Sequence, residues 1–379
     1  MHDIVILGGG SGGYATALRA SQLGLSVVLI EQDKLGGTCL HRGCIPTKAL
    51  LHAAEVADTA REGEAFGVRS TFDGIDMTKV NSYKDGVIGR LYKGLQGLVA
   101  SRAITYVEGY GQLVAPNTIE VNGESYAGRN IVLATGSFAR SIPGLEIAGR
   151  VMTSDQALTL DYVPQSVIIL GGGVIGVEFA SVWRSFGVDV TVIEGLPTLV
   201  PAEDASVSKA MERAFRKRGI NFKTGVRFQS AAQDDSGVNV TLESGETLRA
   251  DLLLVAVGRG PRTEGLGYEA QGIAMDRGFV LTNERLATNV PGVFAVGDIV
   301  PGLQLAHRGF QQGIFVAEEI AGLAPLAIDE TGIPRVTYSE PEIASIGYTE
   351  AQAKEKFGEV ESYEYNLGGN GKSQILGTA

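Results

Sequence analysis

Residues 3–31, DIVILGGGSGGYATALRASQLGLSVVLIE, and residues 166–194, SVIILGGGVIGVEFASVWRSFGVDVTVIE, decide the fold of this 379-residue chain. The two stretches align with each other without a gap. Each contains a short apolar run, a glycine-rich turn, a helical stretch and a second apolar run that ends in Glu. A strand–turn–helix–strand unit that occurs twice predicts an α/β fold with two Rossmann-like domains.

The glycine-rich turn of each unit has the pattern G-x-G-x-x-G. The first glycine permits a tight turn, the second lets the backbone approach a pyrophosphate, and the third lets helix and strand pack closely. The helix N-terminus that follows favours phosphate groups. An acidic residue at the tip of the second strand can accept hydrogen bonds from ribose hydroxyls. We therefore expect two dinucleotide sites, formed by Gly8, Gly10, Gly13 and Glu31, and by Gly171, Gly173, Gly176 and Glu194.

The residues after each unit indicate which nucleotide binds there. Glu194 is followed by the uncharged residues 195–198, GLPT, with no Arg or Lys to accept a ribose 2′-phosphate, which favours NAD over NADP. Glu31 is followed by a segment that holds both cysteines of the chain. Redox chemistry is thereby expected beside the first nucleotide, and FAD suits that position.

The cysteine segment, residues 36–48, reads GGTCLHRGCIPTK. On a regular helix, residues i and i+5 lie roughly 8.6 Å apart, whereas a disulfide needs about 4.4–6.8 Å between its Cα atoms. A redox-active disulfide between Cys39 and Cys44 therefore requires a distorted turn, which Gly43 and Pro46 permit. A helix that starts here would also stabilise a thiolate at its N-terminus. Two alternatives are a pair of inert buried thiols and a zinc site formed by Cys39, His41, Cys44 and His52, whose spacing matches no common four-ligand pattern.

Composition excludes several classes of protein. With 44% hydrophobic residues the chain can bury sizeable cores, so it is not expected to be disordered. The longest apolar run, residues 252–257, is far too short to span a bilayer. A net charge of −11 argues against nucleic acid as a partner, and we interpret the cationic residues 213–218 as the solvated face of a helix. No secretory signal is visible before residue 4, so a cytoplasmic location is expected.

The cysteine segment closely resembles the active-site motif of the pyridine nucleotide–disulfide oxidoreductases. The chain also contains five further motifs of this family. In chain order they are GGGSGG, which precedes the cysteine segment, and then LATGS (133–137), GGGVIGVE, VGRGPRT (257–263) and TNVPGVFAVGD (288–298). The branch of the family that oxidises dihydrolipoamide is the most similar. The family usually has Asn where this chain has His41, and we assign no function to that difference.

The resemblance implies roles for individual residues. Cys39 would exchange sulfur with the substrate, and Cys44 would lie against the flavin as a thiolate. Lys48 and Glu178 would form a buried ion pair beside the flavin, so the predicted catalytic set is Cys39, Cys44, Lys48 and Glu178. His307 is interpreted as structural. Further flavin contacts are expected from Thr38, Lys48, Thr135, Gly136, Asp298 and Ala306, and a further NAD contact from Gly258.

The resemblance also implies an order of domains. Residues 1–147 would form the first segment of an FAD-binding domain, residues 148–265 an NAD-binding domain, and residues 266–335 a return to the FAD-binding domain. Residues 336–379 would begin an α+β interface domain, in which the glycine cluster 368–371 is expected to be a loop. No metal is predicted.

The implied activity is the transfer of electrons from dihydrolipoamide through the Cys39–Cys44 disulfide and FAD to NAD⁺. The partner would be lipoamide carried on the lipoyl domain of a 2-oxo acid dehydrogenase complex, and the intact parent protein would be a homodimer. The alternatives are a glutathione- or mycothiol-type disulfide reductase, which in the glutathione case usually has arginines after the second acidic residue, and a non-catalytic flavin- and NAD-binding fragment.

The end of the chain carries one further expectation. Members of the family take the thiol proton with a base in a late His-x-His-Pro segment, and the four histidines here (2, 41, 52 and 307) do not lie in one. We therefore expect a truncated chain with little physiological turnover. Residues 373–376, SQIL, are expected to be a strand with an unpaired edge, which is an association hazard, so the truncated chain is expected to be monomeric or to aggregate.

Overall fold

The two repeated units adopt the same local fold in the computed structural model, which describes residues 1–377. The last two residues of the predicted interface segment, 336–379, lie outside the described residues. In the first unit, β1 (His2–Leu7) leads through α1 (Ser11–Gln22) to β2 (Val27–Glu31), and in the second, β9 (Ser166–Leu170) leads through α6 (Val174–Ser185) to β10 (Asp189–Glu194). The predicted strand–turn–helix–strand repeat is confirmed.

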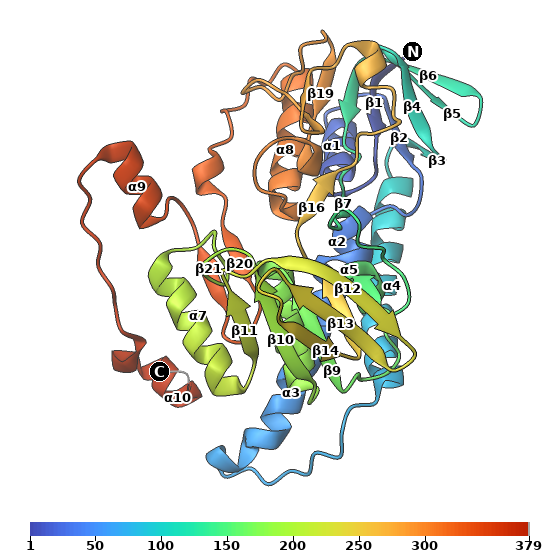
Figure 1. The fold of residues 1–379 in the computed structure, drawn as a ribbon. Helices are drawn as coiled ribbons and strands as arrows, with labels where there is room; N and C mark the ends of the chain where they lie inside the picture. Colours follow the sequence, from blue (N-terminus) through green and yellow to red (C-terminus); the bar gives the residue numbers. More distant parts are fainter. Residues whose placement is uncertain (378–379) are drawn as a thin grey trace.

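The first sheet combines strands from distant parts of the sequence. Its parallel part has the order β3-β2-β1-β6-β19, in which β3 is Ile104–Glu108, β6 is Glu124–Leu133 and β19 is Val293–Ala295. The first half of β6 also pairs antiparallel with β5 (Thr118–Val121), which pairs with β4 (Gly111–Ala115). β19 returns to this sheet and lies near β1 (Figure 1). The Gly297–Ile299 turn, which follows β19 in the chain, therefore lies beside the first nucleotide unit.

The second sheet is fully parallel, with the order β11-β10-β9-β15-β8. Its remaining strands are β8 (Val151–Thr153), β11 (Asn221–Thr224) and β15 (Leu252–Val255). All four residues of β15 are buried, as expected for a strand covered on both faces. An antiparallel sheet packs against it and contains β12 (Phe228–Asp234), β13 (Gly237–Leu242) and β14 (Thr247–Ala250).

The chain forms two short strands where it passes between the two parallel sheets. β7 (Ser137–Ala139) pairs antiparallel with β16 (Arg259–Pro261). The outgoing and returning connections therefore run side by side, between the upper and lower halves of the molecule in Figure 1. A second small pair is formed by β17 (Met275–Asp276) and β18 (Phe279–Val280).

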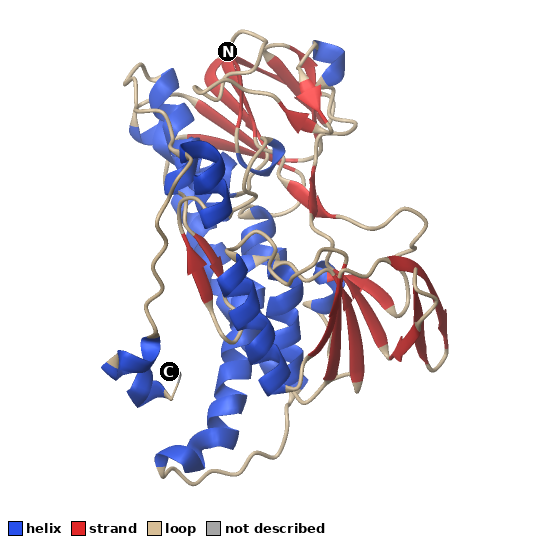
Figure 2. Cartoon of the chain, turned by 60° about the vertical axis from the view of Figure 1, so that its left-hand side comes forward, coloured by secondary structure: helices blue, strands red, loops and turns tan. Residues whose placement is uncertain are grey.

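The helices gather in a column beside the sheets (Figure 2). α1 packs against α8 (Ala306–Ile320) so closely that a Cβ atom added to Gly313 would lie 2.3 Å from the Gly12 carbonyl oxygen. α3 (Cys44–Glu62) packs against α6 of the second unit, so it joins the two halves. The other helices before residue 330 are α2 (Gly37–Arg42), α4 (Met77–Ala100), α5 (Ser154–Ala157) and α7 (Ala205–Arg218).

The final segment contains β20 (Arg335–Thr337), β21 (Ile343–Ser345), α9 (Glu350–Phe357) and α10 (Gly371–Leu376). The expectation of a strand at 373–376 is wrong, because these residues lie in α10. The Asn370 side chain accepts a hydrogen bond from the Ser373 N–H (3.1 Å), and Gly377 ends the helix with a φ of 69°. The expected loop at 368–371 is only partly observed, because a 3₁₀ turn ends at Gly369, Asn370 lies outside regular structure and α10 begins at Gly371.

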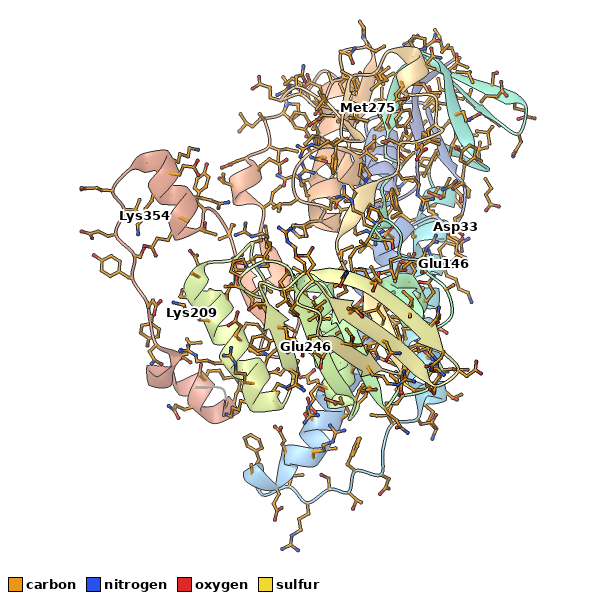
Figure 3. The ribbon with its side chains drawn as sticks, viewed as in Figure 1. Asp33, Glu146, Lys209, Glu246, Met275 and Lys354 are labelled. Atoms are coloured by element: carbon orange, nitrogen blue, oxygen red, sulfur yellow. The ribbon has the colours of Figure 1, made fainter. Side chains whose placement is uncertain are left out.

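The cationic residues on α7 are mainly solvated, as expected. Arg213, Arg216 and Lys217 are exposed, and Lys209 lies on the same helix (Figure 3). Arg218 differs, because its side chain is only 19% exposed and donates to Asp58 at 2.9 Å. In the part of the chain that the structure describes, no helix has both the length and the hydropathy needed to cross a membrane.

The third glycine of the first motif tests this fold. A Cβ atom at Gly13 would lie 1.8 Å from the Gly8 carbonyl oxygen, so backbone must move to accommodate it. We predict that Gly13→Ala lowers the free energy of unfolding by about 3 kcal/mol or more, measured by urea denaturation. Gly89→Ala, where a Cβ meets open space on α4, is the control and should be neutral or stabilising. Equal stability of the two variants would contradict the prediction.

Candidate functional site

The two glycine turns are built with the same hydrogen bonds. Glu31 accepts from the Gly9 N–H at 2.6 Å, and Glu194 accepts from the Gly172 N–H at 2.7 Å. Each carboxylate also accepts from a backbone N–H two residues further along the chain, at 2.9 and 2.7 Å respectively. The acidic residues therefore hold the tips of the turns, with their remaining acceptor capacity available to a ribose.

The three glycines of each turn meet different surroundings. Cβ atoms at the last glycines, Gly13 and Gly176, would lie within 1.9 Å of a backbone oxygen. The middle glycines differ, because a Cβ at Gly10 meets its nearest atom only at 3.9 Å and one at Gly173 meets nothing within 4 Å. In each turn the last glycine is packed against backbone and the middle glycine faces open space. The open side is where a pyrophosphate can approach the backbone.

The cysteine segment contains the distortion that its sequence predicts. α2 ends at Arg42, and Gly43 has the non-helical angles φ −147° and ψ −108°. α3 begins at Cys44, so that sulfur lies at a helix N-terminus and the helix dipole favours a thiolate there. Both cysteines are free thiols in this structure.

The pKa values of the two thiols are shifted in opposite directions. Cys39 donates a hydrogen bond to the Cys44 sulfur, which lowers the pKa of Cys44 to about 7, and the positive charge of Lys48 contributes in the same direction against the effect of burial. The same hydrogen bond, together with burial, raises the pKa of Cys39 far above its ordinary value. In the reduced pair the proton therefore favours Cys39 and the negative charge favours Cys44.

Lys48 and Glu178 form the ion pair that the resemblance implies. The Lys48 Nζ atom lies 2.9 Å from both carboxylate oxygens of Glu178. Lys48 is on α3 and Glu178 on α6, so the pair joins the two nucleotide units. The Glu178 side chain is only 4% exposed, and a buried carboxylate of this kind requires a partner. Glu178 also accepts from the Tyr338 N–H at 2.9 Å.

Most of the predicted flavin residues gather around one cleft with about 1110 Å³ of empty space. The cleft has both cysteines and the Lys48–Glu178 pair on its walls. Val174 and Ile175, at the start of α6, lie on its other side and bring the second unit to the same space. The predicted residues that line it are Gly10, Thr38, Cys39, Cys44, Lys48, Gly136, Glu178, Asp298 and Ala306.

A second, smaller cavity of about 330 Å³ of empty space lies at the far side of the first glycine turn. Gly8, Glu31 and Thr135 line it. The Thr135 hydroxyl is already engaged, since it donates to the Arg262 carbonyl at 2.6 Å. Gly8 lines this cavity and Gly10 lines the cleft, so both hollows adjoin the first glycine turn.

A polar group that sequence reasoning missed supports Asp298. The Ser137 hydroxyl donates to Asp298 at 2.5 Å, and Arg259 donates to the Ser137 oxygen at 2.8 Å. Burial lowers the pKa of Arg259. Ser137 is in β7 and Arg259 in β16, so the strand pair between the sheets builds this group. Both residues lie inside the motifs LATGS and VGRGPRT, but their contact needs the tertiary fold.

Not every predicted residue reaches the cleft. Gly171, Gly173, Gly176, Glu194 and Gly258 lie around the second glycine turn, where a Cβ on Gly258 would also meet open space. His307 lies on α8 and its Nε2 is 2.7 Å from the Pro334 carbonyl oxygen. His41 contacts the Leu35 carbonyl oxygen and the ring of Tyr92. Among residues 1–377 no three His, Cys, Asp or Glu side chains form a metal-binding group.

These residues fit a flavin dinucleotide and a nicotinamide dinucleotide. Each of two glycine turns has a middle glycine facing open space, a helix N-terminus and an acidic residue at the tip of the next strand. The first turn lines two cavities, and the larger one has both thiols on its wall. Such an arrangement can pass an electron pair between sulfur and a nicotinamide through a flavin.

Comparison with known proteins defines the class. Residues 2–313 match the family model described as pyridine nucleotide-disulphide oxidoreductase, and residues 333–379 match the dimerisation domain of the same family. The chain therefore belongs to the pyridine nucleotide–disulphide oxidoreductases, with a Rossmann-like fold, and it is an NAD-dependent flavoprotein with FAD and NAD as its cofactors.

Particular relatives refine the comparison. A dihydrolipoyl dehydrogenase of Bacillus subtilis (strain 168) is 42% identical, with 99% of this chain and 83% of the relative covered. The leghemoglobin reductase of Glycine max is 39% identical, with 97% and 72% covered. Among solved structures, the HOCl-induced flavoprotein disulfide reductase RclA from Escherichia coli is 28% identical with a TM-score of 0.88, covering 99% of this chain and 84% of that one.

The open glycine gives a test of the first nucleotide site. We predict that Gly10→Ala changes the free energy of unfolding by less than about 1 kcal/mol but reduces the flavin content of the purified protein, because the added methyl group occupies the open side of the turn. Flavin absorbance per chain and urea denaturation measure the two quantities. Full flavin content in Gly10→Ala would show that the phosphates do not approach this glycine.

The charge of Lys48 gives a second test. We predict that Lys48→Gln raises the pKa of the Cys44 thiol by about one unit, because the ammonium no longer stabilises the thiolate. The measurement is ultraviolet thiolate absorbance of the reduced protein as a function of pH. Lys93→Gln, an exposed change on α4, is the control. An unchanged titration in Lys48→Gln would remove Lys48 from the thiolate site.

Proposed function

We propose that this chain is an FAD-dependent dihydrolipoyl dehydrogenase, which passes electrons from dihydrolipoamide through the Cys39–Cys44 pair to NAD⁺. The observation that carries the proposal is the cleft in which the thiol pair, the Lys48–Glu178 pair and the start of α6 meet. Full-length similarity to dihydrolipoyl dehydrogenases, at 36–42% identity, supports the choice of dithiol.

The proposed chemistry at the sulfurs balances as a thiol–disulfide exchange. A substrate thiolate attacks Cys39 of the oxidised pair, the Cys39–Cys44 bond breaks, and Cys44 leaves as the thiolate. The second substrate thiol then closes the cyclic disulfide of lipoamide and releases Cys39 as a thiol. The substrate loses two electrons and two protons in total. The first proton passes to solvent when the attacking substrate thiol ionises, and the second stays on Cys39, in agreement with its raised pKa.

Other residues hold the reduced state in place. Lys48 keeps a positive charge beside the Cys44 thiolate, and Glu178 fixes the ammonium by two contacts of 2.9 Å. Bound FAD would supply the two-electron transfer between this thiolate and the nicotinamide. We assign its binding to Gly8, Gly10, Gly13, Glu31, Thr38, Lys48, Thr135, Gly136, Asp298 and Ala306, and that of NAD to Gly171, Gly173, Gly176, Glu194 and Gly258.

The same proposal covers domains and partners. Residues 1–147 and 266–335 would form the FAD-binding domain, supported by the pairing of β19 with β6. Residues 148–265 would form the NAD-binding domain, and residues from 336 the interface domain of a homodimer, supported by the dimerisation-domain match. The lipoamide would be presented by the lipoyl domain of a 2-oxo acid dehydrogenase complex.

The two half-reactions test the function separately. We predict that anaerobic dihydrolipoamide or NADH, but not NADPH, reduces the protein and produces a long-wavelength thiolate-to-flavin absorbance band. Cys44→Ser should abolish the band, whereas Cys39→Ser should show it without reductant, because Cys44 can then no longer form the disulfide. Reduction by glutathione with no response to dihydrolipoamide would favour another disulfide reductase, and no band under any condition would contradict the proposal.

A further inference from the structure

The segment that follows β20 lies along α6 and is hydrogen-bonded to it at two points. The Tyr338 N–H donates to Glu178 at 2.9 Å, and the Glu340 N–H donates to Ser181 at 3.0 Å. Glu178 and Ser181 are three positions apart in the sequence and so face the same side of the helix. Arg218 donates to the Glu340 carbonyl oxygen at 3.1 Å. A segment of the dimerisation-domain match is therefore fixed against the carboxylate that holds Lys48.

The side chain of Tyr338 makes a second contact with the same ion pair. The Lys48 Nζ atom lies 4.7 Å from the centroid of the Tyr338 ring, a distance at which a cation is attracted to an aromatic face. The ring, and not the phenolic hydroxyl, makes this contact. The Lys48 side chain is 33% exposed and Tyr338 is 42% exposed, so both reach the solvent-accessible edge of the site.

These two contacts act on different members of the pair. The backbone N–H of Tyr338 binds the Glu178 carboxylate, whereas the ring lies over the Lys48 ammonium. A lysine side chain has four rotatable bonds and, at this exposure, gains entropy by swinging into water. The aromatic ring opposes that movement and keeps the ammonium inside the cleft.

From this geometry we infer that Tyr338 is a positioning residue of the thiolate site, whose ring keeps the Lys48 ammonium beside Cys44. The inference rests on the proposed function, since it assigns the thiolate the role described there. It assigns a role in this site to a residue of the dimerisation-domain match. An aromatic ring at position 338 is required, and Phe should replace Tyr.

The charged groups near Cys44 set the direction of the expected effect. Lys48 favours the thiolate, and Glu178 disfavours it. Cys39 donates its hydrogen bond, and Arg259 and the half-buried Tyr14 also sense the charge of Cys44. When the ring is lost, Lys48 moves outward while Glu178 stays, because its carboxylate is held by the backbone. The thiolate must then become less stable.

The test uses the flavin-containing chain with Cys39→Ser, in which Cys44 is the only cysteine and the Ser hydroxyl can still donate to it. The long-wavelength thiolate-to-flavin band is titrated with pH in this background and in combination with Tyr338→Phe or Tyr338→Leu. Below the midpoint we expect Tyr338→Leu to weaken the band about two- to fivefold, the factor that corresponds to an exposed cation–π contact. Tyr338→Phe should titrate like the parent.

A double-mutant cycle separates positioning from general damage. In a Lys48→Gln background, Tyr338→Leu should leave the midpoint of the band unchanged, because the ammonium on which the ring acts is gone. Tyr338→Met serves the same comparison if the Leu variant does not fold.

Two results would overturn the inference: titrations of Tyr338→Leu and Tyr338→Phe that coincide, or a Tyr338→Leu effect that persists without Lys48. A parent Cys39→Ser chain with no band would instead contradict the proposed function.

Discussion

The ion pair between Lys48 and Glu178 is the interaction on which the architecture of the site depends. It joins α3, which begins at the Cys44 thiolate, to α6, which begins at the second glycine turn. Only 4% of the Glu178 side chain is exposed, and burying a carboxylate is costly unless it is paired. The pair therefore links the two nucleotide units beside the two thiols.

The electrostatics of the thiols follow from this arrangement. Cys44 combines a hydrogen bond from Cys39, a helix N-terminus and the Lys48 charge, and together they overcome the cost of burying a thiolate. Cys39 has no comparable stabilisation and keeps its proton. One sulfur is thus prepared to face an electron acceptor as an anion, and the other to exchange with a substrate. Two identical side chains acquire different roles because their surroundings differ.

The sequence predicted those features that depend on interactions between residues close together in the chain. The repeated units, both glycine turns and the break at Gly43 depend on residues a few positions apart, and the structure has each of them. Prediction failed at residues 373–376, where a strand was expected but capping by Asn370 and Gly377 accompanies a helix. A strand makes its backbone hydrogen bonds with a neighbouring strand, whereas a helix makes them within its own segment.

Contacts between distant segments were beyond local patterns. The Ser137–Asp298 hydrogen bond, the Arg259 contact with Ser137 and the position of Tyr338 over Lys48 each join residues more than 100 positions apart. The sequence by itself determined the two nucleotide-binding units and the kind of redox group, because glycine spacing and paired cysteines act through local backbone geometry. Only the tertiary structure decided which groups surround the two sulfurs, because electric fields and burial depend on every segment that packs nearby.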